Sequence, residues 1–382
     1  MYDVPALLEE PALLEPLAAS VRGEPPRYLR SVKIKLTARC NLRCVMCRYG
    51  KGWSPPELAG ARMLEVIDEL AQLGCRKVHF SGGEVLVRRD FEALVGRAAA
   101  ASLKVTFTSN LTLLDKARAK ALMRHKISSI STSLDGATAR VHERVRGIPG
   151  SFRRTLRALR LLARERARRG RRTRLRVNFV MMRDNFRDYP ELITLAAEHG
   201  ATDVVPMPVD SKRDELRLSK RLIRAYNEEL APIVRARREA AGMPIDAPRV
   251  YPFGTDAEAV RESADGRYAG GYYRARPCYA PYLHMFVAWD GKVYLCCMTN
   301  GRIEPLGDLA RQSAREVFTG PAFQQLRREM LVERLPACHA CDMYTPENTL
   351  LHDALADAAA AGARAPRSMT GAPRRLPVVP TS

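Results

Sequence analysis

Three cysteines within eight residues are the part of this chain best suited to chemistry. Cys40, Cys44 and Cys47 are separated by three and then by two residues. Three thiolates that converge on one point suit an iron-sulfur cluster, which normally takes four cysteine ligands. A structural zinc site would instead be closed by four ligands. With three ligands, one iron of a cluster stays open to bind another molecule.

The segments around this loop predict a parallel α/β fold. Residues 32–36 alternate apolar and basic side chains as a strand does, so the cysteine loop follows the C-terminal end of a strand. That edge is where α/β sheets and barrels bind ligands. Strand-like and helix-like segments then alternate. We expect strands at 32–36, 77–80, 103–108, 128–134, 175–182 and 203–205, and helices at 62–73, 90–100 and 116–123.

The cysteine loop resembles that of the radical S-adenosylmethionine (SAM) enzymes, in which three cysteines of this spacing follow the first strand of a partial barrel. The resemblance implies that the amino and carboxylate groups of SAM chelate the open iron. Electron transfer then cleaves SAM to methionine and a 5'-deoxyadenosyl radical, which abstracts a hydrogen atom from substrate. The residue before the last cysteine lies against the adenine in this family and is often aromatic. Here it is Met46, whose polarizable thioether also packs well on a ring.

Further residues that match the family follow the later strands. Gly82, Gly83 and Glu84 come after the second expected strand; alone they indicate only a turn, but glycines let a ligand approach the backbone and a carboxylate can accept from an ammonium group. The resemblance implies that these three hold the amino end of SAM. It also implies that Ser133 and Arg146 reach its ribose and carboxylate side, since a guanidinium binds carboxylates well. The alternative for Arg146 is a surface arginine.

Two other positions are less clear. Thr108-Ser109-Asn110 stands where the family commonly has Thr-Asn-Gly, which leaves any contact from this loop unassigned. Asn178 on the fifth expected strand is a further candidate contact to SAM. No residue in the sequence identifies itself as the acceptor of the substrate proton.

A second group of cysteines lies near the C-terminus: Cys278, Cys296, Cys297, Cys338 and Cys341. Asp290-Gly291 predicts a hairpin between 284–288 and 292–295. Four thiolates gathered here could bind zinc or a second iron-sulfur cluster, and spacing alone does not choose. The pattern resembles the short auxiliary-cluster (twitch) domain, related to the SPASM domain, of some radical SAM enzymes.

That resemblance implies that Cys278, Cys296, Cys338 and Cys341 ligate one 4Fe-4S cluster. Cys297 is then spare, or exchanges roles with Cys296. If all four irons are occupied, the second cluster serves best as an electron acceptor, and the expected reaction is a net two-electron oxidation. Cys75, between an expected helix and strand, is interpreted as a buried small hydrophobe.

Composition sets the class of protein. A chain of 382 residues suffices for two domains. Nine cysteines without a signal peptide favour a reducing cytoplasm, and no apolar run is long enough to span a membrane. The formal charge is +21, but residues 153–176, with twelve arginines and one acid, supply +11 of it and leave +10 for the rest.

Three explanations of this arginine segment stay open. The segment is a helix with a solvated arginine-rich face, a docking surface for an acidic electron donor, or a nucleic-acid-binding surface. No aromatic residues alternate with the arginines to stack on bases, so nucleic acid is an unlikely partner. A zinc-stapled RNA-binding protein is the alternative of a different class.

We therefore expect an α/β protein with a partial (β/α)6 radical SAM barrel and a small C-terminal auxiliary-cluster domain. The expected divisions are a leader at 1–30, the barrel at 31–210, a connector at 211–274 with one helix at about 219–241 kinked at Pro232, the cluster domain at 275–350 and a disordered tail at 351–382. The short leader and short cluster domain favour oxidation of a small natural-product intermediate over the alternative, modification of a ribosomal peptide. Flavodoxin or ferredoxin would supply electrons, as in the family.

The seven cysteines of the two groups predict two 4Fe-4S clusters. Protein prepared without oxygen should contain about eight iron and about eight sulfide per chain, as two cubanes require. Iron and sulfide analysis of the whole chain checks this. Colourless protein loaded with zinc would contradict it.

Overall fold

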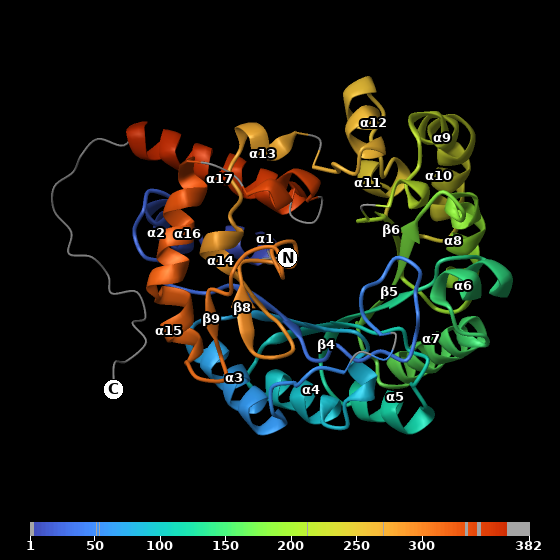
Figure 1. The fold of residues 1–382 in the computed structure, drawn as a ribbon, viewed down its shortest axis with the longest axis horizontal. Helices are drawn as coiled ribbons and strands as arrows, with labels where there is room; N and C mark the ends of the chain where they lie inside the picture. Colours follow the sequence, from blue (N-terminus) through green and yellow to red (C-terminus); the bar gives the residue numbers. More distant parts are fainter. Residues whose placement is uncertain are drawn as a thin grey trace.

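The computed structural model describes residues 4–50, 52, 54–211, 213–269, 271–332, 335–341 and 345–364. One sheet of nine strands organises these residues, in the order β6-β5-β4-β3-β2-β1-β7-β8-β9 (Figure 1). The strands are β1 Ser31–Lys35, β2 Lys77–Ser81, β3 Lys104–Thr108, β4 Ile127–Ser133, β5 Arg174–Met181, β6 Asp203–Pro208, β7 His284–Val287, β8 Lys292–Tyr294 and β9 Gly307–Asp308.

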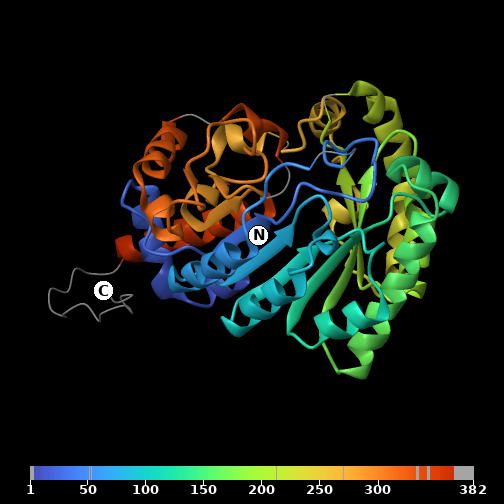
Figure 2. The ribbon, with the colours of Figure 1, turned by 60° about the horizontal axis from the view of Figure 1, so that its bottom comes forward.

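Strands β1 to β6 form the predicted partial barrel. Each pairs in parallel with the next along the chain. Parallel neighbours require crossover connections, and these are helical: α3 Gly60–Gln72, α4 Phe91–Ala100, α5 Lys116–Met123, α6 Ala139–Arg146, α7 Ser151–Arg168 and α8 Tyr189–Glu198. Figure 2 shows these helices along the outer side of the curved sheet. Among the described strands β6 pairs only with β5 and ends the sheet, so the barrel stays open, and the predicted fold class is confirmed.

Side chains of the first barrel strand alternate between the two faces of the sheet. In β1, Val32 and Ile34 are fully buried against the helices, whereas Lys33 and Lys35 lie on the inner face and stay partly exposed. An apolar outer face is what packing against helices requires. The polar inner face is therefore the surface available to a ligand at the strand ends.

The C-terminal segment continues the sheet of the barrel. Strand β7 pairs in parallel with β1, with Ser31 opposite His284, and the Ser31 hydroxyl lies 2.8 Å from Nδ1 of His284. Strands β8 and β9 then follow in antiparallel order, which confirms the expected hairpin. Helices α14 Ala280–Leu283, α15 Ala314–Thr319, α16 Pro321–Val332 and α17 Thr345–Arg364 complete this half. The second cysteine group is thus built onto the edge strand of the barrel.

Both ends of the described chain depart from the prediction. Helices α1 Val4–Leu8 and α2 Leu14–Val21 were expected as a loose leader, but Val4, Leu7 and Leu17 are buried in the main core. The disordered tail was expected from residue 351, yet α17 continues to Arg364 and Leu351 is fully buried. These apolar side chains are buried because α1 packs against α17, so the two ends of the described chain cover each other. Residues 365–382 lie outside the described part.

The connector contains the expected helix in three parts. Helix α9 Lys220–Ala225 runs through a π-helical segment, Tyr226–Leu230, into α10 Ala231–Ala240. Pro232 lies in the first turn of α10, so the irregularity just before it accommodates the missing N–H. Helices α11 Ala247–Val250, α12 Ala257–Ala264 and α13 Tyr272–Ala275 follow. No helix among the described residues has the length and apolar character to cross a membrane.

A buried arginine fastens the connector to the barrel. Arg238 of α10 is 0% exposed and donates to Oδ1 of Asp203 at 2.6 Å and to the carbonyl oxygen of Val204 at 2.7 Å. Arg249 binds the other oxygen of Asp203 at 2.8 Å. Asp203 opens β6, so these bonds hold the connector against the edge strand. Removal of one partner would leave a buried charge unpaired.

Replacement of Arg238 by Met should therefore lower the free energy of unfolding by about 3–5 kcal/mol, the usual cost of breaking a buried ion pair. Arg235→Met is the matched control, because Arg235 lies on the same helix with an exposed side chain. Urea unfolding of both variants checks the prediction. Equal losses of stability would show that the pair does not hold the connector.

Candidate functional site

The three cysteines of the first group lie on the loop that leaves the C-terminal end of β1. Cys44 is buried, and Cys40 and Cys47 are half-buried. Two sulfurs already receive backbone hydrogen bonds: Leu42 N–H donates to Sγ of Cys40 at 3.5 Å, and Tyr49 N–H donates to Sγ of Cys47 at 3.4 Å. Hydrogen bonds to cysteine sulfur are one way in which a protein tunes an iron-sulfur cluster. The loop thus provides the donors that such a cluster needs.

Three thiols on one loop suit a cubane cluster, which distributes its thiolates over separate irons. Among the side chains that the structure describes, no three His, Cys, Asp or Glu form a group that could hold a metal ion. Burial raises the pKa of the Cys40 thiol to about 11 and also raises that of Cys44. Ligation by these groups must release protons.

Arg146 contacts the first cysteine group directly. This last residue of α6 is 8% exposed, and its NH1 lies 3.6 Å from Sγ of Cys44. Its NH2 forms an ion pair with Oδ2 of Asp135 at 2.6 Å, and the other oxygen of Asp135 accepts from Val180 N–H at 2.9 Å. Burial raises the pKa of Asp135, an effect that Arg146 opposes. Arg146 is therefore not a surface arginine; its contact with SAM remains a prediction.

Glycines allow neighbouring backbones to pack on the cysteine loop. Gly83 N–H donates to the carbonyl oxygen of Thr37 at 2.8 Å, and a Cβ at Gly83 would overlap the carbonyl oxygen of Arg39. Gly147 has φ +73°, and a Cβ there would lie 2.6 Å from the carbonyl oxygen of Arg43. The close approach expected for a ligand at Gly82 and Gly83 is used here by the protein's own main chain. Whether SAM also contacts them stays a prediction.

Glu84 connects the ends of two strands. Its carboxylate is buried and accepts from Leu86 N–H at 2.9 Å, from the Ser109 hydroxyl at 2.6 Å and from Asn110 N–H at 2.6 Å. Burial raises the pKa of Glu84, and these hydrogen bonds oppose that rise. A carboxylate has about four acceptor positions, so one remains for an ammonium group. Replacing Glu84 would disturb the fold as well as any ligand contact.

Asn110 is a site residue that the sequence left unassigned. Its side-chain amide donates to Oδ1 of Asn41 at 2.9 Å and lies 3.9 Å from Sγ of Cys40. Its carbonyl oxygen accepts from the Thr155 hydroxyl of α7 at 3.0 Å. The segment that departs from the family pattern therefore supports the cysteine loop. The position of Asn110 after the third strand could have indicated a site residue. Its partner Asn41, however, lies about seventy residues away in the chain.

The remaining residues expected to contact SAM lie along the same edge of the barrel. Met46 packs in a small apolar cluster with Val145, Met182 and Val209, which gives the loop a hydrophobic wall beside the ends of β5 and β6. Ser133 and Asn178 are opposite each other on the inner face of β4 and β5. The wall suits an adenine ring, and contact of these residues with SAM stays a prediction.

The second cysteine group separates into two environments. Cys278, Cys296, Cys338 and Cys341 all belong to the main apolar core, whereas Cys297 packs with Phe286 and Tyr294 in another cluster. The amide of Asn348 lies 3.7 Å from Sγ of Cys278, and Cys341 N–H donates to the carbonyl oxygen of Cys338 at 3.2 Å. Burial, then Cys297 and Cys278, raise the pKa of Cys296. This grouping favours Cys296 over Cys297 as the ligand.

One thiol, that of Cys75, lies outside these two groups. The Cys75 thiol donates to the carbonyl oxygen of Lys77 at 3.3 Å inside the core, where burial raises its pKa to about 12. Its interpretation as a buried small residue agrees with this position. All nine cysteines are free thiols in the structure.

A network between the two cysteine groups was not predicted. Lys35 Nζ donates to the Tyr49 hydroxyl at 2.5 Å, Asn300 donates to the same oxygen at 3.4 Å, and Arg48 donates to the carbonyl oxygen of Asn300 at 3.3 Å. Burial, with Lys33 and Arg48 nearby, lowers the pKa of Lys35 to about 7. A cavity of about 430 Å³ adjoins it, lined by Arg48, Trp289, Tyr294, Asn300 and Gly301. These contacts join the cysteine loop to the C-terminal half.

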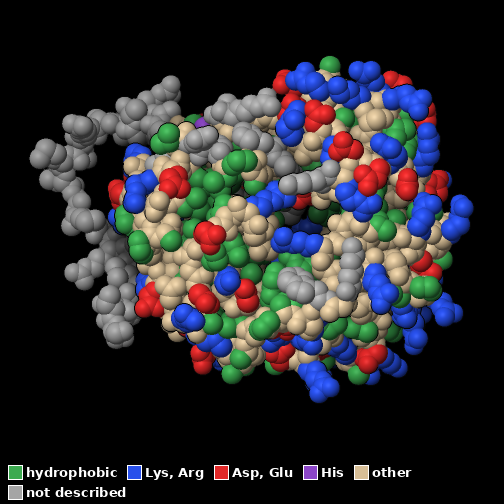
Figure 3. Space-filling view, in the orientation of Figure 1, with side chains coloured by type: hydrophobic (Ala, Val, Ile, Leu, Met, Phe, Trp, Pro, Cys, Tyr) green, Lys and Arg blue, Asp and Glu red, His purple; other side chains and the backbone are tan. Residues whose placement is uncertain are grey.

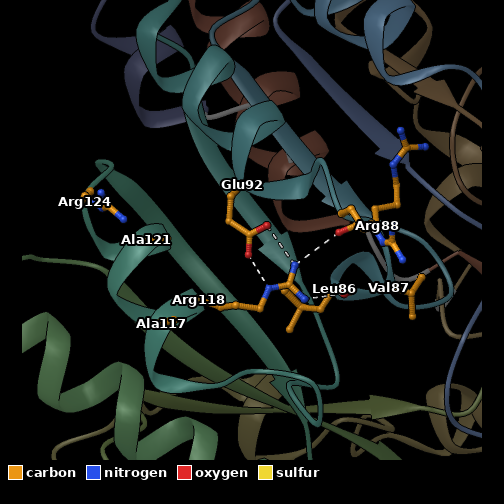
Figure 4. A pocket seen from close by; sticks show the side chains of 9 residues that line it. Leu86, Val87, Arg88, Glu92, Ala117, Arg118, Ala121 and Arg124 are labelled. Carbon is orange, nitrogen blue, oxygen red and sulfur yellow. Dashed lines mark hydrogen bonds and ion pairs between the residues drawn. The ribbon is translucent and has the colours of Figure 1, made fainter.

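A second cavity, of about 470 Å³, lies on the outer surface beside α4 and α5 (Figure 4). Arg118 crosses it and binds Glu92 through two bonds of 2.5 and 3.0 Å, and it also donates to the carbonyl oxygen of Leu86 at 2.6 Å. The charges at its centre are thus already paired. Because it lies among the outer helices, this cavity is separate from the inner face that carries the cysteine loop.

Comparison with known families matches both halves of the chain. Residues 34–196 match the profile of the radical SAM superfamily, and residues 278–342 match that of an iron-sulfur cluster-binding domain, SPASM. The first match spans β1 to α8 and includes the first cysteine group. The second begins at Cys278 and includes the other four C-terminal cysteines.

Curated relatives are similar over the barrel. The chain is 34% identical over 174 residues to AdoMet-dependent heme synthase of Methanosarcina barkeri, which is 45% of this chain and 48% of that protein. It is 33% identical over 186 residues to PqqA peptide cyclase of Granulibacter bethesdensis, covering 47% and 46%. For mycofactocin maturase MftC of Mycobacterium tuberculosis the identity is 36% over 169 residues, covering 44% and 42%. The chain thus spans about half the length of these relatives.

Solved structures with the same fold cover more of the chain. Streptococcus suis SuiB has a TM-score of 0.61 at 16% identity, over 82% of this chain and 71% of that one. The enzyme anSMEcpe with bound AdoMet has a TM-score of 0.58 at 17% identity, over 82% and 86%. At these identities the likeness supports the fold alone.

Gly147→Ala should prevent the first cluster from assembling, because the new Cβ meets the backbone of the cysteine loop as well as an unfavourable φ. Gly170→Ala is the matched control: its φ is +58° and nothing lies within 4 Å, so it should cost only about 1–2 kcal/mol of stability. Iron content per chain distinguishes the two variants. A Gly147→Ala protein with its full iron content would contradict the prediction.

Proposed function

Because this chain belongs to the radical SAM superfamily and carries a C-terminal SPASM domain, we propose that it is a radical SAM enzyme that modifies a peptide. Its cofactors are SAM and 4Fe-4S clusters, which the two domains bind. The observation that carries the proposal is the cysteine loop at the C-terminal end of β1, held on the inner edge of the barrel by Arg146, Gly83 and Asn110.

The comparisons favour a peptide over the small molecule that the sequence suggested. Two of the relatives that match at 33% and 36% identity are named a peptide cyclase and a maturase. A structural neighbour has also been solved bound to a precursor peptide. The short leader that pointed to a small molecule carries no weight, because its residues are part of the core and peptide recognition can reside in a separate chain. The main interpretation of the sequence thus gives way to its alternative.

Each of the site residues has its own role in the proposed reaction. Cys40, Cys44 and Cys47 would hold the first cluster, while Arg146 balances the negative charge of the thiolates. When bound, the reduced cluster supplies the electron that cleaves SAM to the 5'-deoxyadenosyl radical. Glu84 offers its remaining acceptor position to the ammonium group of SAM, and the apolar wall at Met46 packs against the adenine. The inner face of the sheet then positions the substrate and excludes water.

The electron donor would be an acidic protein of the flavodoxin or ferredoxin type. Helix α7 presents an exposed series of arginines with few acids: Arg153, Arg154, Arg157, Arg160 and Arg164. Figure 3 shows Lys and Arg side chains crowded on the side of the molecule where α6 to α8 lie. Surface charge of one sign steers the encounter with an oppositely charged partner.

Oxidation of a small molecule is the second candidate. It is favoured by one observation, the 34% identity to AdoMet-dependent heme synthase. Mass spectrometry of the product separates the two candidates. A peptide substrate would carry the mass change at a residue of its amino-acid sequence, whereas the other candidate would yield an oxidised small molecule.

Substitution of Cys40, Cys44 or Cys47 by Ala should abolish formation of 5'-deoxyadenosine from SAM under dithionite, because the first cluster loses a ligand. Chromatography of the reaction mixture measures the product. The second cluster should remain, with about four iron per chain. Undiminished 5'-deoxyadenosine in these variants would refute the assignment.

Cys338→Ala should have the opposite effect. SAM cleavage should continue, but the modified substrate should no longer form, since the second cluster can no longer take the electron left on the substrate radical. Cys297→Ala is the matched control and should retain both activities. Electron paramagnetic resonance of the second cluster supplies a further check, because a substrate-induced change in iron coordination would overturn its role as an electron acceptor.

A further inference from the structure

Cys44 is bound to the last turn of α6 by the main chain on both sides of it. Arg43 N–H donates to the carbonyl oxygen of Arg146 at 3.1 Å. Val45 N–H donates to the carbonyl oxygen of Val145 at 2.9 Å. The side chain of Arg146 reaches the residue between these two, because its NH1 donates to Sγ of Cys44 at 3.6 Å. Three contacts thus fix this guanidinium beside one sulfur of the first cysteine group.

Asp135 carries the negative charge that accompanies this arginine. It lies two residues past the end of β4, is fully buried, and places Oδ2 2.6 Å from NH2 of Arg146. Burial raises the pKa of Asp135, and among the described residues Arg146 is the one charged side chain that opposes this rise. His142 of α6 adds no charge, because burial and then Arg146 lower its pKa to about 3. The charges of Asp135 and Arg146 therefore offset each other.

Asp135 is itself held by hydrogen bonds to the end of β5 and to α6. Its Oδ1 accepts from Val180 N–H at 2.9 Å. Its carbonyl oxygen accepts from the side-chain amide of Asn185 at 3.1 Å, and that amide also donates to the carbonyl oxygen of Val180 at 2.9 Å. Its N–H donates to Nδ1 of His142 at 3.2 Å. With these atoms fixed, Oδ2 stays directed at Arg146.

The ion pair determines how much charge Arg146 brings to a cluster on the cysteine loop. The reduction potential of an iron-sulfur cluster depends on its net charge and on hydrogen bonds to its sulfurs. Reduction adds one negative charge, so a nearby cation stabilises the reduced state, strongly where the effective dielectric constant is low. An unpaired Arg146 would therefore raise the potential. Paired with Asp135, it still supplies the N–H donor to Cys44, while the carboxylate offsets its charge.

We propose that Asp135 is a positioning residue that acts on the first cluster through Arg146. It holds the guanidinium beside Cys44 and offsets its charge, so that the cluster keeps a low reduction potential. The inference rests on the proposed function, which places a cluster on the three cysteines of this loop. A cluster of low potential is the stronger reductant, and cleavage of SAM requires the cluster to give up an electron. Arg146 thus stabilises the loop without removing this reducing power.

The test measures the reduction potential of the first cluster without turnover. Holoenzyme without SAM is titrated potentiometrically and followed by electron paramagnetic resonance; Cys44→Ala identifies the signal of the first cluster by removing it. Asp135→Asn keeps the shape of the side chain and an acceptor for Val180 but removes the charge. At a fixed potential its ratio of reduced to oxidised cluster should rise at least about tenfold, a shift of about 59 mV for one electron.

Substitution of Arg146 should act in the opposite direction. Arg146→Met removes a positive charge and the donor to Cys44, so the ratio should fall. Arg146→Lys, the conservative variant, should bring the ratio back toward that of the unmodified protein. A pair with a merely structural role would loosen the loop alike in Asp135→Asn and Arg146→Met, and the two ratios would then change in the same direction.

Asp203→Asn is the matched control, because it removes the carboxylate of another buried ion pair, that with Arg238. Asp203 lies two strands away from Asp135, level with Ser131 by the strand register, so its effect on the ratio should stay below about threefold.

Three results would overturn the proposal: an unchanged ratio in Asp135→Asn, an equal rise in Asp203→Asn, or changes of the same sign in Asp135→Asn and Arg146→Met. If Asp135→Asn does not retain the iron of the first cluster, the two Arg146 variants decide, and a ratio that does not fall in Arg146→Met overturns the proposal. Unmodified protein without any signal from the first cluster would contradict the proposed function itself.

Discussion

The structure depends most on how tightly the backbone of the cysteine loop is packed. The loop after β1 forms main-chain hydrogen bonds with two other segments: Gly83 and Glu84 donate to carbonyl oxygens of its first half, and its own Arg43 and Val45 donate to carbonyl oxygens at the end of α6. Gly83 and Gly147 permit this because any side chain there would overlap the loop. The loop that carries the three sulfurs is thereby held by the segment that follows β2 and by α6, which follows β4. A cluster bound here is fixed by the barrel as a whole.

Charge provides the second constraint. Arg146 and Asp135 bring a buried ion pair to Cys44, Arg238 and Asp203 fasten the connector to β6, and Lys35 joins Tyr49 between the cysteine groups. A buried charge without a partner is costly, so these contacts specify positions as much as they stabilise them.

Much of this could be predicted from the sequence, because the information is local. The six barrel strands and helices α3 to α5 follow from alternating and helical periodicity, and the cysteine spacing predicted the first site. The residues that hold that site were harder, because Asn110, Tyr49 and Asp135 act through partners far away in the chain. The packing of α1 against α17 was missed for the same reason: it joins opposite ends of the sequence. The extension of the sheet by β7 is another such non-local pairing.

The choice between Cys296 and Cys297 shows what only the fold provides. The two residues lie in the bend and turn that follow β8, where the Cys296 thiol joins the core with Cys278 and the Cys297 thiol packs with Phe286 and Tyr294. Sequence spacing alone leaves both possible.

The function proposed for this chain requires the first cluster to have one open iron that binds SAM. The most direct measurement is electron paramagnetic resonance of a reduced Cys278→Ala, Cys338→Ala double variant, which retains only the first cluster, recorded with and without SAM. We expect a single cluster signal whose shape changes when SAM is added. An identical signal in both samples would contradict it.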